Sequence, residues 1–253
     1  MKAFGIILLG ILFSLQLAAR EVDLRLWISG GTQGLVLGSR ECPGWLSVAR
    51  QLAQDDPEAC WLHLGAPPLY DAFLKVEGLK FPDVLVPTEE DFRLQGLGSL
   101  TDPLLPFTLL NIEPLPQFPE AHVPFSSQGI WKQNDGVAVH VFALISDKAP
   151  LRIPADRLRP LQVTDPLLSF RDSLTNQPIL EQVFPVLVLP EDADGSEWST
   201  RFPEIPVLVM PPGGQSKVVE VQEGKQLRVQ PAKFGRSPIR VQIYWDTVTR
   251  TFR

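Results

Sequence analysis

The sequence predicts an α/β domain. Its 253 residues contain short, continuous apolar runs, which are typical of strands buried on both faces, and these runs alternate with segments that have helical periodicity. Proline, with 25 residues, stands at the ends of many of the apolar runs, where it delimits strands. Because strands interleave with short helices, we expect a central sheet that is mostly parallel.

The expected strands are apolar or alternating runs, and the last two are expected to be antiparallel. They are Leu24 to Ile28, Cys60 to Leu64, Asp83 to Val86, Leu104 to Asn111, Val137 to Ile145, Val183 to Leu189, Ile205 to Met210, Gln226 to Val229 and Ile239 to Trp245. The expected helices are Gly44 to Ala53, Leu69 to Val76 and Asp165 to Asn176. In the last of these, Asp165 is a suitable cap before Pro166. The proline-rich segment from Pro114 to Pro124 is expected to be an extended surface loop.

The charge of the chain argues against one class of partner. The formal net charge is −6, and no run of Lys and Arg exceeds two residues. Nucleic-acid binding needs clustered basic residues, so we do not expect a nucleic-acid partner.

The first 19 residues have the pattern of a signal peptide. Lys2 supplies a positive start, Phe4 to Leu17 is an apolar stretch, and Ala18 and Ala19 are small residues suited to cleavage. We therefore expect a periplasmic or secreted protein whose single domain covers residues 20–253, with no membrane span after cleavage. An uncleaved membrane anchor is the alternative, although the stretch is short for a span of about 20 residues.

Two cysteines, Cys42 and Cys60, would lie in an oxidising compartment. Cys42 stands just before the first expected helix and Cys60 opens the strand that follows it. A helix of about ten residues spans ~15 Å, whereas a disulfide needs Cα atoms within ~7 Å. We therefore expect two free thiols.

Several segments occur in an order that is characteristic of one family. They are Leu26 to Gly34, Leu62 to Ala66, Pro82 to Phe92, Pro106 to Ile112, Gly136 to Val139 and Lys233 to Val241. In this order the chain resembles the metallophosphoesterase domain of secreted 5′-nucleotidases and 2′,3′-cyclic phosphodiesterases. The resemblance implies a calcineurin-like sandwich of mixed β-sheets flanked by helices. We expect no counterpart of the family's C-terminal nucleotide-recognition domain.

The resemblance also implies where metal ligands would stand. That family uses two metal ions to clamp a phosphate and activate water, held by Asp, His and Asn at strand ends. The corresponding positions here are Gly31, Gln33, Ala66, Glu89, Glu90, Glu191, Pro212 and Gly214. None of them is the residue type that the family uses, so we expect no catalytic residue, metal or cofactor, and a degenerate site.

Other candidate sites are weaker. The three histidines, His63, His122 and His140, are expected to have structural roles. The turn from Gly30 to Gly34 follows a strand but lacks the Lys of a phosphate-binding loop. The segment from Asp192 to Glu197 has alternating oxygen ligands before a Gly, but a solvated acidic turn is the simpler interpretation than a calcium loop.

The carboxyl ends of the expected strands carry prolines and acidic residues. They are Ala66 to Pro68, Pro87 to Glu90, Pro190 to Asp192 and Met210 to Pro212. Ligands of open α/β sheets bind at these ends, and an acidic mouth without metal repels phosphate. The sequence therefore favours a pseudoenzyme that binds another envelope or secreted protein. The alternatives are a metal-dependent phosphoester hydrolase with a divergent site and a structural component of an envelope assembly.

Overall fold

The computed structural model describes residues 21–30, 45–65, 78–95, 100, 107–132, 136–176, 182–233 and 238–253. The expected signal peptide, the expected helix from Leu69 to Val76, and Cys42 lie outside these residues. No helix in the described ranges is long and apolar enough to cross a membrane.

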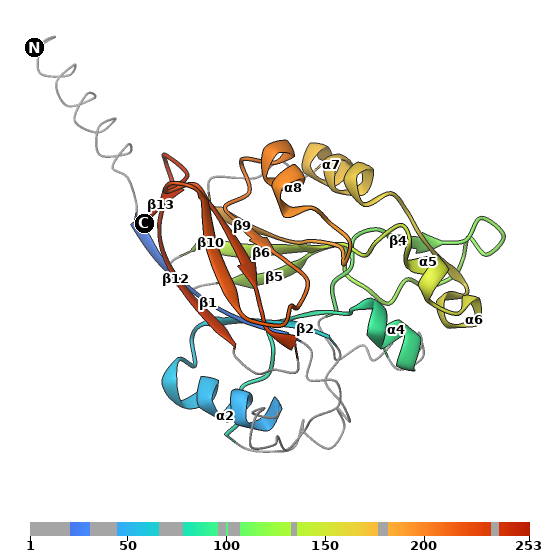
Figure 1. The fold of residues 1–253 in the computed structure, drawn as a ribbon, viewed down its shortest axis with the longest axis horizontal. Helices are drawn as coiled ribbons and strands as arrows, with labels where there is room; N and C mark the ends of the chain where they lie inside the picture. Colours follow the sequence, from blue (N-terminus) through green and yellow to red (C-terminus); the bar gives the residue numbers. More distant parts are fainter. Residues whose placement is uncertain are drawn as a thin grey trace, which may run out of the picture.

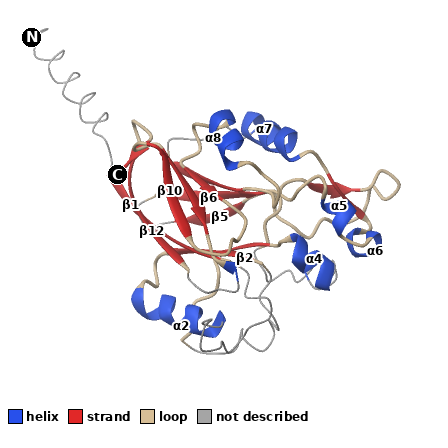
Figure 2. Cartoon of the chain, viewed as in Figure 1, coloured by secondary structure: helices blue, strands red, loops and turns tan. Residues whose placement is uncertain are grey.

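Two β-sheets form the centre of the molecule, with helices on their outer sides (Figures 1 and 2). The first sheet has the order β13-β12-β1-β2-β3, and the second has the order β10-β11-β9-β8-β6-β5. A two-stranded ribbon, β4-β7, lies apart from them. The mixed sheets and flanking helices confirm the expected fold class.

The strands have the following bounds. They are β1 (Glu21–Ser29), β2 (Cys60–Leu64), β3 (Val84–Val86), β4 (Ile112–Pro114), β5 (Gly129–Lys132), β6 (Ala138–Ala143), β7 (Leu161–Val163), β8 (Val183–Val188), β9 (Val207–Val209), β10 (Lys217–Gln222), β11 (Gln226–Gln230), β12 (Ile239–Asp246) and β13 (Thr251–Phe252). The helices are α2 (Trp45–Asp55), α4 (Glu89–Gln95), α5 (Ala149–Arg152), α6 (Ala155–Leu158), α7 (Pro166–Asn176) and α8 (Gly195–Arg201).

The parallel part of each sheet lies inside it, as the interleaved pattern predicts. β1, β2 and β3 pair in parallel, as do β6, β8, β9 and β11. β12 is antiparallel to β1, in agreement with the expectation for the end of the chain. The other closing strand differs, because β11 pairs in parallel with β9 and is antiparallel only to β10.

The molecule has four layers, which are α2, the first sheet, the second sheet, and α7 with α8. An apolar cluster lies between each pair of adjacent layers. Between the sheets, alternate residues such as Leu24 and Leu26 of β1 pack with Val139 and Val186 of the second sheet. On the outer face of the first sheet, the other residues of β1 and β2 pack beneath α2. On the outer face of the second sheet, side chains of β6, β8 and β9 pack with α7 and α8. This division of side chains between the two faces of a sheet follows from strand geometry. Along the first residues of β1, burial alternates with the period of two expected of a strand.

Three expectations about local structure need correction. The strand expected from Leu104 to Asn111 is not continuous, because Phe107 and Thr108 form only isolated bridges and β4 begins at Ile112. The segment from Pro87 to Glu90 is not only a strand end, since helix α4 begins at Glu89. The segment from Asp192 to Glu197 is a turn only at its start, and helix α8 begins at Gly195. Residues 115–124 form turns and irregular chain after β4.

Candidate functional site

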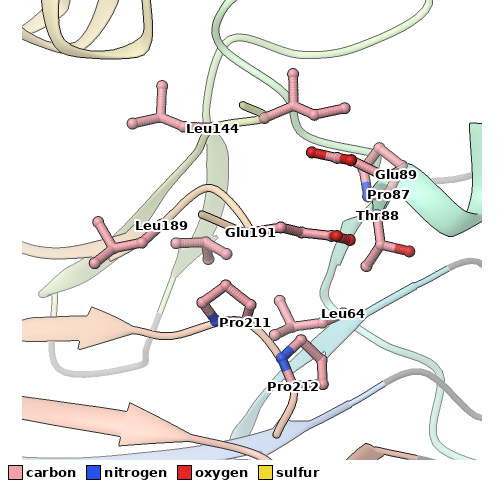
Figure 3. A pocket seen from close by; sticks show the side chains of 11 residues that line it. Leu64, Pro87, Thr88, Glu89, Leu144, Leu189, Glu191, Pro211 and Pro212 are labelled. Atoms are coloured by element: carbon pink, nitrogen blue, oxygen red, sulfur yellow. The ribbon is translucent and has the colours of Figure 1, made fainter. Parts of the chain in front are cut away.

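The carboxyl ends of strands from both sheets meet around one small cavity, which we call the mouth (Figure 3). Its lining residues follow or end β2, β3, β6, β8 and β9. They are Leu64, Pro87, Thr88, Glu89, Leu144, Ile145, Val188, Leu189, Glu191, Pro211 and Pro212. The cavity has a volume of about 30 Å³. That is room for one or two water molecules, whereas ligand pockets usually have about 300 Å³ or more.

An ion pair occupies one side of the mouth. The Arg152 guanidinium, at the end of α5, donates from Nε to Oε2 of Glu89 at 2.6 Å and from Nη2 to Oε1 at 2.5 Å. Both carboxylate oxygens of Glu89 are therefore engaged by one planar fork, the geometry that makes Arg–carboxylate pairs strong. The Glu89 side chain is only 7% exposed, whereas that of Arg152 is 42% exposed. A positive group of the chain itself thus neutralises a buried carboxylate.

Glu89 is held in place by the start of α4. The Thr88 backbone N–H and hydroxyl both donate to Oδ2 of Asp91 at 2.7 Å. The backbone N–H of Asp91 donates in return to the Thr88 carbonyl at 3.1 Å. This is a capping arrangement, in which a side chain three residues into the helix satisfies the backbone before it. It fixes the first turn of α4, and with it the direction of the Glu89 side chain.

A second carboxylate reaches the same cavity. In Figure 3 the Glu191 side chain, which follows β8, extends across the mouth toward Thr88 and Glu89. Its carboxylate accepts a hydrogen bond from the Glu89 backbone N–H. Burial, followed by the nearby Glu89 charge, raises the pKa of Glu191 above its ordinary value. The mouth is thus acidic, but its charge is partly offset by Arg152.

The end of β1 closes tightly against the second sheet. A Cβ atom built on Gly30 would lie 2.5 Å from the Ala232 carbonyl oxygen and 3.0 Å from Cβ of Pro212. The chain around Pro212 is itself fixed, because the Gly213 N–H donates to the Pro231 carbonyl at 2.8 Å. Only a glycine leaves room for this contact, so the two sheets meet backbone to backbone beside the mouth.

The structure places the candidate site residues in different environments. Glu89, Glu191 and Pro212 line the mouth. Glu90 is one residue further along α4 and forms an ion pair with Arg93. Gly214 lies in a bend, and a Cβ atom built on it would have no other atom within 4 Å. Gly31, Gln33 and Ala66 lie outside the described residues.

The donors that the described residues place in the mouth do not fit a two-metal centre. Glu89 and Glu191 are the acidic residues among the described lining residues, and Arg152 occupies both oxygens of Glu89. Within the described part of the chain, no three His, Cys, Asp or Glu side chains gather closely enough to hold a metal ion. Two-metal catalysis needs several such ligands around each ion.

The histidines have other surroundings. His63 is fully buried on β2, where its Nδ1 lies 2.7 Å from the hydroxyl of Ser29. The Trp61 indole N–H donates to the same hydroxyl at 2.9 Å, so Ser29 links the two ring side chains. Burial lowers the pKa of His63 to about 3. His140 is half-buried, and its Nδ1 lies 3.1 Å from Oε1 of Gln128. His122 is exposed.

The segment from Asp192 to Glu197, considered for calcium above, has a structural explanation. Asp194 caps α8, since its Oδ1 accepts from the Ser196 N–H at 2.8 Å. The Asp192 carboxylate pairs with Lys148 at 3.3 Å. Two of the acidic side chains are therefore used by a helix cap and an ion pair.

No local sequence pattern indicates the cation that pairs with Glu89 of the mouth. Arg152 is separated by 63 positions from its partner Glu89 and comes from a four-residue helix that the sequence pattern did not indicate. The only local signal was the Lys148-Ala149-Pro150 stretch, where a proline stands in the first turn of α5.

Comparison with solved structures agrees with this fold. The chain superposes on a putative 5′-nucleotidase from Staphylococcus aureus with a TM-score of 0.66 and 13% identity, covering 91% of this chain and 52% of that one. It superposes on the NAD nucleotidase of Haemophilus influenzae with a TM-score of 0.67 and 11% identity, covering 92% and 49%. It superposes on a calcineurin-like phosphoesterase from Bacillus subtilis with a TM-score of 0.62 and 13% identity, covering 92% of this chain and 88% of that one.

These similarities confirm a metallophosphoesterase-like fold. The chain spans about half the length of the two nucleotidases. No protein-family model and no curated protein matches the sequence. At this level of identity the likeness concerns the fold, and function has to be argued from the site.

Proposed function

We propose that this chain is a non-catalytic binding domain on a metallophosphoesterase-like fold, and that its partner is another protein. The observation that carries the proposal is the Glu89–Arg152 pair in the mouth. A guanidinium is a permanent cation that cannot activate water as a metal ion does. It neutralises Glu89 where the resemblance would place a metal ligand. The mouth thus has an internal counter-charge instead of a donor set.

The surface beside the mouth supports a protein partner. Helix α4 contacts α5 and α6, and the three helices gather at one end of the molecule (Figure 1). Leu94 of α4 is 60% exposed and Leu151 of α5 is 86% exposed. Leu151 is adjacent to Arg152 in the sequence, and Leu94 lies five residues after Glu89 on α4. Contiguous exposed apolar patches mark protein contact sites, and we propose that these two leucines belong to one.

The rigidity of the mouth favours association as well. The backbone around the mouth is fixed by prolines after β3 and β9, namely Pro87, Pro211 and Pro212. The Thr88–Asp91 cap fixes the start of α4. A surface that is already ordered loses little conformational entropy when a partner binds. We therefore place the partner on α4, α5 and the rim of the mouth.

Site-specific photo-crosslinking in the native host tests this placement. A crosslinking amino acid at Leu94 or Leu151 should give one discrete product, and the same residue at Val248, which is 50% exposed in the β12–β13 turn, should not. The substitution Leu151→Lys should abolish the product formed from position 94. Equal products from Val248, or no loss with Leu151→Lys, would place the interaction elsewhere.

We also propose that the chain is exported, on the basis of the signal-like segment in residues 1–19. The intact mass of the protein recovered from the host should correspond to a chain that starts at Arg20. A mass that includes Met1 would show that the segment is retained as an anchor.

A further inference from the structure

A second cavity lies between α7 and α8, on the outer face of the second sheet. Its volume is about 430 Å³, within the usual range for small-molecule sites. It is lined by Asp165, Leu167, Leu168, Arg171, Arg201 and Phe202, none of which lines the mouth. We propose that this cavity binds a small organic anion, a carboxylate on a flat apolar body. This inference is independent of the function proposed for the mouth.

The floor of the cavity is apolar and fixed. Phe202 is 8% exposed, and its ring lies edge-on to Phe170 at 4.8 Å between centroids and near Trp198 at 5.5 Å. The buried Gln226 amide donates to the Phe202 carbonyl at 3.0 Å, which holds the backbone at the end of α8. An aromatic ring held in this way is a preorganised surface for a planar apolar group.

The walls of the cavity are also apolar on one side. Leu167 and Leu168 lie in the first turn of α7, and Leu168 is 48% exposed. A ligand that covers Leu168 and Phe202 would remove apolar surface from water, which favours binding. This effect accounts for the apolar body of the ligand, but not for its charge.

Two guanidinium groups provide the charge. Arg171 lies one turn after Leu167 on α7. Among the residues that the structure describes, its side chain forms no ion pair. Arg201, at the end of α8, pairs with Glu197 at 2.8 Å, but both side chains are about half exposed, at 53% and 49%. Exposed pairs of this kind are weak, so a ligand carboxylate can compete for Arg201. Arginine binds carboxylates through two parallel hydrogen bonds.

The one acidic lining residue does not oppose this assignment. Oδ1 of Asp165 accepts from the Leu168 N–H at 2.9 Å and so caps α7. Its negative charge is offset by the positive end of the helix dipole. The ligand carboxylate is expected to pair with Arg171 and Arg201.

Calorimetric titration of the purified chain with 2-naphthoate tests the proposal, with uncharged 2-naphthamide as the matched ligand. We expect a Kd below about 1 mM for 2-naphthoate and at least about tenfold weaker binding of the amide. Arg171→Gln and Arg201→Gln should each weaken 2-naphthoate binding several-fold, and Arg50→Gln on the exposed face of α2 should not change it. All three substitutions are at exposed positions, and circular dichroism will confirm that each variant is folded.

Three results would overturn the proposal. They are absence of saturable binding to the wild-type chain, equal binding of 2-naphthoate and 2-naphthamide, and unchanged binding by an Arg171→Gln, Arg201→Gln double variant. A failure of this test leaves the crosslinking test of the mouth unaffected, because the two sites share no lining residue.

Discussion

Arg152 holds the buried carboxylate of Glu89 through two hydrogen bonds, across 63 positions of sequence. The pair links α5 to the first turn of α4, and its carboxylate lines the cavity where the carboxyl ends of the strands meet. Its energetic consequences can be measured directly, because one partner is buried and the other is not.

Removing Arg152 should destabilise the protein more than removing Glu89. In Arg152→Met a carboxylate that is 7% exposed loses its counter-charge, and we expect the free energy of unfolding to fall by about 2–4 kcal/mol. In Glu89→Gln the remaining guanidinium is 42% exposed and stays hydrated, so the loss should be smaller. The double variant Glu89→Leu, Arg152→Met should recover stability relative to Arg152→Met. Chemical denaturation measures all three, and equal losses in the two single variants would contradict this account of the pair.

The protein should lose stability as the pH falls below the ordinary pKa of histidine. The folded-state pKa of His63 is lowered from 6.5 to about 3 by burial, so the unfolded chain binds one more proton than the native state between these values. Stability from this group is present above pH 6.5 and is lost toward pH 3, by about 1.4 kcal/mol per pH unit. Denaturation curves between pH 7 and 5 should show this slope, and His63→Gln should remove it. An unchanged slope in that variant would assign the pH dependence to other groups.

Cys60 should be unreactive in the native protein. Its thiol is fully buried, and burial, followed by the charge of Asp83, raises its pKa well above the ordinary value. Because the thiolate is the reactive form, alkylation should be slow until the protein unfolds. A Cys42→Ser variant isolates this thiol, and mass spectrometry should detect modification in denaturant but not in buffer. Rapid modification in buffer would mean that β2 opens readily.

Gly30→Ala should test the close contact between the two sheets. The added Cβ would meet a backbone carbonyl oxygen at 2.5 Å, and backbone cannot yield as a flexible side chain does. We expect a loss of about 1–3 kcal/mol in the free energy of unfolding. Gly214→Ala is the matched control, since its Cβ would enter open space. If both variants have the same melting temperature, the sheets are not in contact at Gly30.

The sequence was sufficient to predict the framework of the fold. The apolar runs that became β6 and β8 are continuous because the strands are covered on both faces, between the sheets on one side and by helices on the other. The cap at Asp165 was also predictable, and its carboxylate accepts from the Leu168 N–H. These features depend on local pattern, which sequence shows directly.

The short helices α4, α5, α6 and α8 were missed, although for α4 and α8 the sequence contained capping signals. Thr88 and Asp91 form the cap of α4, and Asp194 caps α8. We interpreted both segments by their acidity, as a strand end and as an acidic turn, although acidic residues are also favoured in first helical turns. Capping chemistry was the better guide at both places.

Arg152 is the residue that no local pattern could assign. Its role depends on a contact between α5 and α4 that forms only when the chain folds. Family resemblance pointed to the positions of Glu89 and Glu191, but it could not indicate the cation that neutralises one of them. The same is true of the α7–α8 cavity, whose two arginines lie 30 positions apart (Arg171 and Arg201).

Metal analysis combined with a hydrolysis assay tests the central claim most directly. The purified chain is incubated with Mn²⁺ or Zn²⁺, dialysed, and analysed for bound metal, and the same samples are assayed with adenosine monophosphate and p-nitrophenyl phosphate. We predict far less than one metal ion per chain and no hydrolysis above the buffer rate. One or two tightly bound ions per chain, with hydrolysis that a chelator abolishes, would contradict the account and establish a metal-dependent phosphoester hydrolase.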